Sequence, residues 1–170
     1  MYRFGRKSKE QLLSCHPDIQ LILNEVIKYY DFSILEGIRS TIRQGKLFKE
    51  GRSKLDGIKK KSKHQGKKYG NELVSYAVDI MPYKKGTNAF SGKKKDIARF
   101  YFLMGMVKAV SKKLLEDGLI THTVRFGLDW DSDDIFTDQN FDDLPHFELR
   151  KIKWETKKEI SNENRMGKQR

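Results

Sequence analysis

The sequence is poor in cysteine, in apolar residues and in long apolar segments. Cys15 is the only cysteine among 170 residues, so an intramolecular disulfide is excluded. No apolar run reaches the length of a membrane span, and the first residues lack an apolar signal-peptide core. We therefore expect neither membrane insertion nor a signal peptide. Cys15 precedes His16, and we interpret it as a small buried residue, with a metal-binding pair as the alternative.

The scarcity of apolar residues does not exclude a folded core. They make up 37% of the chain and charged residues 34%, but 10 Phe, 7 Tyr and 2 Trp supply side chains to bury. The net charge of +12 favours an anionic partner: nucleic acid, anionic lipid headgroups or anionic cell-wall polymers. Charge alone does not choose among these three.

The spacing of apolar residues predicts an α+β domain. We expect a small, mostly antiparallel sheet with helices to one side, and a loop over the basic stretch 46–68. One domain over 1–154 should be followed by a basic, flexible tail over 155–170. The predicted helices and strands follow from periodicity and from capping residues. Helices are expected over 16–30, 40–51 and 94–118, and strands over 31–37, 75–83, 124–130 and 146–152.

One acid and two of the four histidines are candidate site residues. Asp79 is the one acid in the apolar segment YAVDIMPY, and an isolated buried carboxylate needs a cation, a metal or strong donors. His64 lies in a polar loop, and His146 opens the last predicted strand, three residues after Asp143. Two imidazoles and a carboxylate are a common ligand set of catalytic zinc, and a further carboxylate can serve as base. From the residues alone, the favoured reading is the other one: a surface His64, a capping or ion-paired Asp79 and a plain turn at Asp143.

Five motifs in a fixed order resemble a known family. EGIRSTIRQGKLFKEGRSK, SKH, YAVDIMPY, RFGLDWD and DLPHFEL resemble the VanY-type D-alanyl-D-alanine carboxypeptidases, and above all the phage L-alanyl-D-glutamate endopeptidases that serve as endolysins. The opening YRFGRKSKEQL is similar too, so the resemblance spans residues 2–150. It implies a Hedgehog/D-Ala-D-Ala peptidase-like fold and a zinc metallopeptidase that degrades peptidoglycan of the bacterial cell wall during host lysis. We expect cleavage of the L-Ala–D-Glu bond, with D-Ala–D-Ala carboxypeptidase activity as the alternative.

The resemblance also implies a role for each matched residue. His64, Asp79 and His146 correspond to zinc ligands, and Asp143 to the general base. Arg39 corresponds to the arginine that steadies the oxygen of the attacked carbonyl. Three further residues match motif positions and are expected to support the site: Ser62, Gln44 and Glu148.

The segment between the first two ligands departs from the family pattern. Many relatives have the short form S-x-H-x-x-G-x-A-x-D, whereas fourteen residues, QGKKYGNELVSYAV, lie here between His64 and Asp79. We expect this basic, glycine-containing insert to loop out without breaking the following strand. If His64 were not the ligand, His122 would be the only downstream substitute.

An acidic segment precedes the last predicted strand. It holds seven aspartates and no basic residue, and DWDSDD sets Asp129, Asp131 and Asp133 at alternate positions, as at the start of an EF-hand. Asp134 and Asn140 stand where an EF-hand needs glycine and glutamate, so this is not an EF-hand. We interpret it as a solvated acidic loop, with Ca²⁺ binding as the alternative.

The partners follow from this reading. We expect a monomer whose basic surface favours the anionic wall, present in the host cytoplasm until a separate membrane-permeabilising protein releases it. The rival reading is a nucleic-acid-binding protein or a metal-dependent nuclease. We expect no nucleic acid as partner, because no base-reading motif occurs and the candidate site is acidic.

Overall fold

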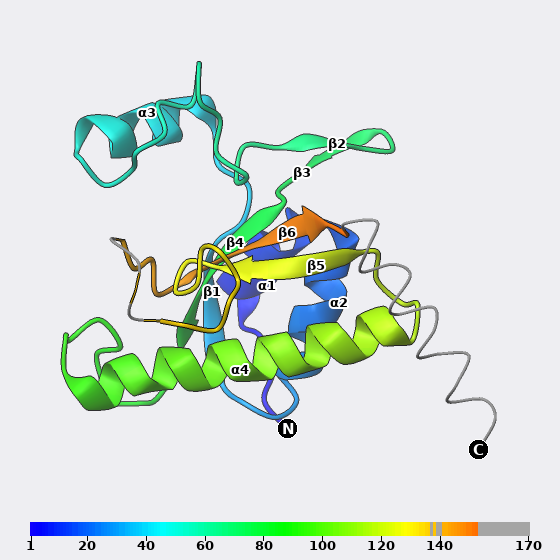
Figure 1. The fold of residues 1–170 in the computed structure, drawn as a ribbon, viewed down its shortest axis with the longest axis vertical. Helices are drawn as coiled ribbons and strands as arrows, with labels where there is room; N and C mark the ends of the chain where they lie inside the picture. The colour runs from blue at the N-terminus through cyan, green and yellow to red at the C-terminus, as the bar shows by residue number, and fades with distance from the viewer. Residues whose placement is uncertain (137, 139–140, 153–170) are drawn as a thin grey trace.

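The computed structural model describes residues 1–136, 138 and 141–152 (Figure 1). The tail predicted at 155–170 lies outside the described residues. Among the helices of the described part, none combines the length and the apolar character that crossing a membrane requires.

The three predicted helices are confirmed, and a fourth precedes them. Pro17 occupies the first turn of one helix, whose N-terminus is capped by the His16 ring accepting the Asp18 amide at 3.1 Å. The short N-terminal helix was not predicted, because within it only Ser8 and Leu12 are buried and its apolar pattern is too weak. The helices are α1 (Arg6–Leu13), α2 (Pro17–Val26), α3 (Thr41–Lys49) and α4 (Lys94–Glu116).

The sheet is antiparallel, as predicted. Four strands pair in the order β1-β4-β6-β5, and two short strands form a separate hairpin. The strands are β1 (Phe32–Glu36), β2 (Lys67–Tyr69), β3 (Glu72–Val74), β4 (Ala77–Pro82), β5 (His122–Phe126) and β6 (His146–Lys151). These elements confirm the α+β class.

The structure corrects two local predictions. The stretch 46–68 is not all loop, because α3 continues to Lys49 and β2 starts at Lys67. The insert after His64 is not an irregular loop either: it forms the β2–β3 hairpin, in which Gly70 adopts a left-handed φ of 57° at the turn. Sequence reading missed this hairpin because its strands are short and mostly exposed.

The two faces of the sheet have different roles. Side chains alternate along a strand, so Val78 and Ile80 of β4 and Phe147 and Leu149 of β6 join the hydrophobic core on one face. Helices α1, α2 and α4 lie on that side of the sheet, while α3 and the β2–β3 hairpin lie beyond the sheet (Figure 1). The residues between these core positions therefore point to the opposite face, where polar side chains gather.

Candidate metal centre

A row of polar residues crosses the outer face of the sheet. Asp79 of β4 is the register partner of His146 on β6, and Glu36 of β1 is the partner of Asp79 on the other side. A bulge between Ile34 and Glu36 shifts the register of β1. Directly opposed residues on neighbouring strands share a face, so backbone pairing alone brings these three side chains together.

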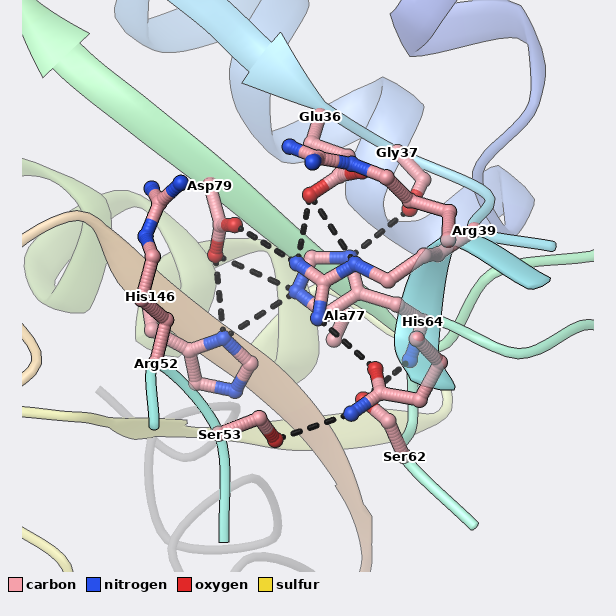
Figure 2. A network of polar contacts seen from close by, with 12 residues as sticks. Glu36, Gly37, Arg39, Arg52, Ser53, Ser62, His64, Ala77, Asp79 and His146 are labelled. Atoms are coloured by element: carbon pink, nitrogen blue, oxygen red, sulfur yellow. Dashed lines mark hydrogen bonds and ion pairs between the residues drawn. The ribbon is translucent and has the colours of Figure 1, made fainter. Parts of the chain in front are cut away.

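His64 reaches the same point from the loop before β2. Its backbone is held at both ends, since its carbonyl accepts the Arg39 amide at 2.9 Å and its amide contacts Ser62 Oγ at 3.3 Å. The residue is 1% exposed. Figure 2 shows its ring facing both Asp79 and His146. The insert after His64 thus leaves this residue inside the site.

The three predicted ligand residues lie in mutual contact. His64 Nε2 is 3.1 Å from Asp79 Oδ1 and 3.2 Å from His146 Nδ1, and His146 Nδ1 is 3.1 Å from Asp79 Oδ1. One ligand atom from each residue therefore lies at a corner of a nearly equilateral triangle (Figure 2).

The contacts of the other nitrogen of each ring determine which nitrogen carries a proton and which keeps a lone pair at the triangle. His64 Nδ1 lies 2.7 Å from the Gly37 carbonyl oxygen, which can only accept, so Nδ1 carries the proton and Nε2 keeps its lone pair. His146 Nε2 lies 3.6 Å from Glu148 Oε2, which favours the proton on Nε2 and the lone pair on Nδ1. Two nitrogen lone pairs and a carboxylate oxygen then face one point. That donor set fits a metal cation.

The charges at the triangle favour a bound cation, which would take the place of the proton that His146 Nδ1 shares with Asp79. Burial acts to raise the pKa of Asp79, but His64 and His146 outweigh it and hold that pKa well below its usual range. Burial acts to lower the pKa of His146, but hydrogen bonds to Asp79 and Glu148 raise it to about 9. The carboxylate is ionised and its surroundings favour positive charge.

Arg39 and Gln44 form a second layer behind Asp79. The Arg39 guanidinium, 10% exposed, donates to Glu36 Oε2 from Nε at 2.9 Å and from Nη2 at 2.5 Å, and to Asp79 Oδ2 at 3.2 Å. Its Nη1 donates to Gln44 Oε1 at 2.9 Å. The fully buried Gln44 in turn donates to Ser53 Oγ at 2.8 Å. This chain of bonds connects α3 and the loop after it to the Asp79 carboxylate.

A third layer behind His146 consists of Glu148, which was predicted to support the site, and Arg125, which was not predicted. Glu148 accepts hydrogen bonds from Arg125 Nε at 3.0 Å and from Nη2, and Arg125 is its register partner on β5. The same guanidinium lies 5.2 Å above the Trp130 ring, and Trp130 packs on the His146 ring at 5.5 Å. Arg125 therefore holds both groups that flank His146. No sequence spacing reveals this pair, because it depends on the register of β5 and β6.

Asp143 stands at the turn that leads into β6. Its amide donates to the Gly127 carbonyl at 2.8 Å, and its own carbonyl accepts the His146 amide at 3.1 Å. The close approach requires glycine, because a Cβ on Gly127 would lie 2.5 Å from the Asp143 carbonyl oxygen. Burial raises the pKa of Asp143, and the negative charge of Asp79 adds to this, whereas His146 opposes it.

All these groups open into one groove. It has a volume of about 860 Å³ and is bordered by α3, the loop after α3, β4, β6 and the acidic loop. Lys54 lies 4.9 Å from the centre of the Phe141 ring, and Trp130 Nε1 donates to the Phe141 carbonyl at 2.8 Å. Charged residues dominate its lining: Glu36, Arg39, Arg43, Arg52, Lys54, Lys61, Lys63, Asp79, Arg125, Asp143 and Glu148.

A second histidine group lies elsewhere, at the start of α2. His122 Nδ1 is 2.8 Å from Asp18 Oδ2, and His16 Nδ1 accepts the Asp18 amide. The lone pair of His16 Nδ1 is thus used to cap a helix, so the group is explained as a structural network. Cys15 is fully buried in the core, as predicted. His122, the predicted substitute ligand, belongs to this network, and His64 lies beside Asp79.

The predicted calcium residues also come together. One carboxylate oxygen each from Asp129, Asp131 and Asp133 lies within 4.8 Å of the others. Asp129 is buried and already accepts the Asp133 amide at 3.1 Å and the Asp134 amide at 3.3 Å. These bonds fold the acidic loop onto itself, and an ion pair from Lys108 to Asp134 connects it to α4.

Known proteins are similar to this chain in sequence, and one solved structure is similar to it in fold. The L-alanyl-D-glutamate peptidase of Escherichia phage T5 is 26% identical over 140 residues, which is 81% of this chain and 88% of that protein. The crystal structure of the Serratia marcescens L-Ala D-Glu endopeptidase ChiX is similar with a TM-score of 0.59 and 25% identity. That similarity covers 87% of this chain and 90% of ChiX.

The family model for phage L-alanyl-D-glutamate peptidases matches residues 1–150, which include every residue of the triangle and of the groove. The resemblance predicted from five motifs is thereby confirmed. The chain belongs to the phage L-alanyl-D-glutamate peptidase family.

Proposed function

We propose that this protein is a zinc-dependent peptidoglycan endopeptidase that hydrolyses the L-Ala–D-Glu bond of stem peptides. The observation that carries the proposal is the convergence of His64, Asp79 and His146 lone pairs at the floor of a groove, in a member of this peptidase family. The names of the phage T5 protein and of ChiX support the choice of bond.

The donor set favours zinc over other cations. Two imidazole nitrogens and one carboxylate oxygen are a frequent protein ligand set of catalytic zinc, which leaves a further position for water or substrate. When bound, zinc lowers the pKa of water to about 7 and polarises the attacked carbonyl. His64 would bind through Nε2 and His146 through Nδ1, because their other nitrogens face Gly37 and Glu148.

Asp143 would act first as the general base and then as the general acid of the reaction. In this proposal its carboxylate accepts a proton from the attacking water and returns it to the leaving amine. Burial raises the pKa of Asp143, so its carboxyl group holds a proton more readily than an exposed aspartate does. Asp143 also lines the groove, where a substrate would lie.

Arg39 would stabilise the oxygen of the attacked carbonyl group by hydrogen bonding, as its matching position in the family implies. Its hydrogen bonds to Glu36, Gln44 and Asp79 use four of its five N–H groups, so one on Nη1 is available to the substrate. The same bonds fix the guanidinium before substrate arrives, and a fixed donor stabilises a developing oxyanion best.

Purified peptidoglycan with and without a zinc chelator tests the proposal. We expect chelator-sensitive release of new D-Glu amino termini, whereas release of free D-Ala would indicate the carboxypeptidase alternative.

Asp143→Ala should retain zinc but lose turnover by about 10²-fold or more, and His146→Ala should lose the metal as well. Wild-type turnover in the Asp143 variant would show that the base is wrongly assigned. DNA cleavage with an intact wall would favour the nuclease.

Binding of a calcium ion by Asp129, Asp131 and Asp133 is a prediction separate from the zinc site. Their carboxylates gather in the acidic loop, and exposed acidic groups commonly do so without binding an ion. Calorimetric titration of the zinc-loaded protein with calcium decides between a cation site and a solvated loop, since only the first releases or absorbs heat.

We further propose that the enzyme works as a monomer and reaches the wall after release from the host cytoplasm.

A further inference from the structure

Lys63, next to the proposed ligand His64, is a half-buried cation of the groove. Its backbone is fixed, because the Lys63 carbonyl accepts the Tyr76 amide at 3.0 Å. Its ammonium donates to the Leu149 carbonyl at 3.4 Å, and within the described part of the chain no carboxylate forms an ion pair with it. The side chain is half-buried and lines the groove.

The charges around Lys63 leave its own charge unbalanced. Lys67, Arg125 and Arg150 repel it, and Glu148 is the one acid that attracts it. Glu148, however, already accepts two hydrogen bonds from Arg125 and faces His146. A half-buried ammonium among three cations is a place where an incoming carboxylate gains more than it would in open solvent.

The other cations of the groove are less suited to this role. Arg39 and Arg125 are bound to the carboxylates of Glu36 and Glu148. Lys54 lies over the Phe141 ring, and Arg52 is exposed. Lys63 is thus the half-buried cation of the groove that a substrate carboxylate can reach without displacing a protein carboxylate.

The chemistry of a glutamyl residue supplies such a carboxylate. It has two carboxyl groups, and only one is needed to continue the peptide chain, so the other is free or amidated. We propose that Lys63 forms a subsite that binds the free carboxylate of the glutamyl residue beside the scissile bond. The enzyme would then select stem peptides in which this group is a carboxylate over those in which it is an amide. The inference rests on the proposed function.

Two matched soluble stem peptides test it, identical except that the free glutamyl carboxyl is a carboxylate in one and a primary amide in the other. For the zinc-loaded wild type we expect kcat/KM to favour the acid by about tenfold or more, as for a charge-assisted hydrogen bond. In Lys63→Gln the acid-to-amide ratio should fall towards one, and Lys63→Arg should retain most of it. Lys68→Gln, an exposed lysine of β2 that does not line the groove, is the control.

The outcomes separate this inference from the function on which it rests. A wild type that cleaves both peptides equally would overturn the subsite, and a preference that survives in Lys63→Gln would overturn its assignment to Lys63. In both cases the peptidase assignment stands. A wild type that cleaves neither peptide nor whole peptidoglycan would overturn the proposed function itself. Zinc affinity measured in each variant confirms that a changed ratio does not come from a lost metal.

Discussion

His64 and Gly37 are joined by a hydrogen bond of 2.7 Å from the ring Nδ1–H to the backbone carbonyl oxygen. This bond determines which nitrogen of His64 faces Asp79 and His146. Gly37 itself is packed against α1, and a Cβ there would lie 2.3 Å from Ser14 Oγ and 2.4 Å from the Gln11 carbonyl oxygen. The orientation of a candidate ligand therefore depends on a glycine that packs against α1, a helix that does not line the groove.

Gly37→Ala should weaken both folding and metal binding. The added methyl group has no room beside Gln11, so the backbone must shift and carry its carbonyl away from His64. We expect a loss of about 1–3 kcal/mol in the free energy of unfolding, measured by denaturant titration, and weaker zinc binding in competition with a chelator. Gly105→Ala in α4, where a Cβ meets nothing within 4 Å, should instead stabilise by about 0.5–1 kcal/mol. Unchanged zinc affinity in Gly37→Ala would contradict the role of this bond.

Zinc should raise the thermal stability of the protein. A ligand that binds only the folded state stabilises it by about 2.7 kcal/mol at one hundred times its Kd. We expect a lower melting temperature after chelation, restored by added zinc. His64→Ala should abolish the response, whereas His122→Gln should retain it, because His122 belongs to the network around Asp18. A response lost in the His122 variant would move the metal to the second histidine group.

Arg125→Met should reduce metal affinity without touching a ligand. Removal of the guanidinium leaves the buried Glu148 carboxylate without its two hydrogen bonds and frees the Trp130 ring that packs on His146. Loss of such outer partners typically costs about 10–100-fold in metal affinity. Glu148→Gln should have a similar effect, and the double variant should be less than additive because the two residues act together. Additive losses would show that Arg125 acts independently of Glu148.

Cys15 should make stability depend on alkaline pH. Burial raises the pKa of its thiol from 9.0 to about 12, so between these values the unfolded chain ionises while the folded protein stays neutral. Stability from this group is complete below pH 9 and falls as the pH rises, by at most about 1.4 kcal/mol per pH unit. Denaturant titrations of wild type and Cys15→Ala across pH 8–11 measure the difference in slope. Equal slopes, or rapid thiol labelling of the folded protein at pH 8, would contradict a buried neutral thiol.

Sequence reading predicts the elements whose periodicity is strong. Helix α4 and strands β4 and β6 were found because their apolar residues repeat at helical spacing or fill a buried strand. Helix α1 and the β2–β3 hairpin were missed, since both are short and largely exposed. Their positions are determined by tertiary contacts, such as the one between Ser8 Oγ and the Ile34 amide.

The candidate site also has parts that the sequence predicts and parts that it does not. His64, Asp79 and His146 could be named from motifs because each has a side chain of distinctive chemistry. The arrangement around them could not be named, since Arg125 meets Glu148 through strand register and Gly37 meets His64 across 27 positions of the chain. Lys63 is one of many lysines in the sequence, and it is distinguished by its burial and by the lack of an ion-pair partner within the described part of the chain.

The layered contacts around the triangle have a consequence for charge neutrality. Glu36, Asp79, Asp143 and Glu148 bring four carboxylates to its surroundings, and Arg39 and Arg125 bring two guanidinium groups. With neutral imidazoles this inner set carries an excess of two negative charges, which a divalent cation cancels. A loaded centre would be electroneutral, so the other basic residues of the groove lining would supply the attraction for an acidic peptide: Arg43, Arg52, Lys54, Lys61 and Lys63. The metal would therefore neutralise the centre, and the remaining cations of the groove would attract the substrate.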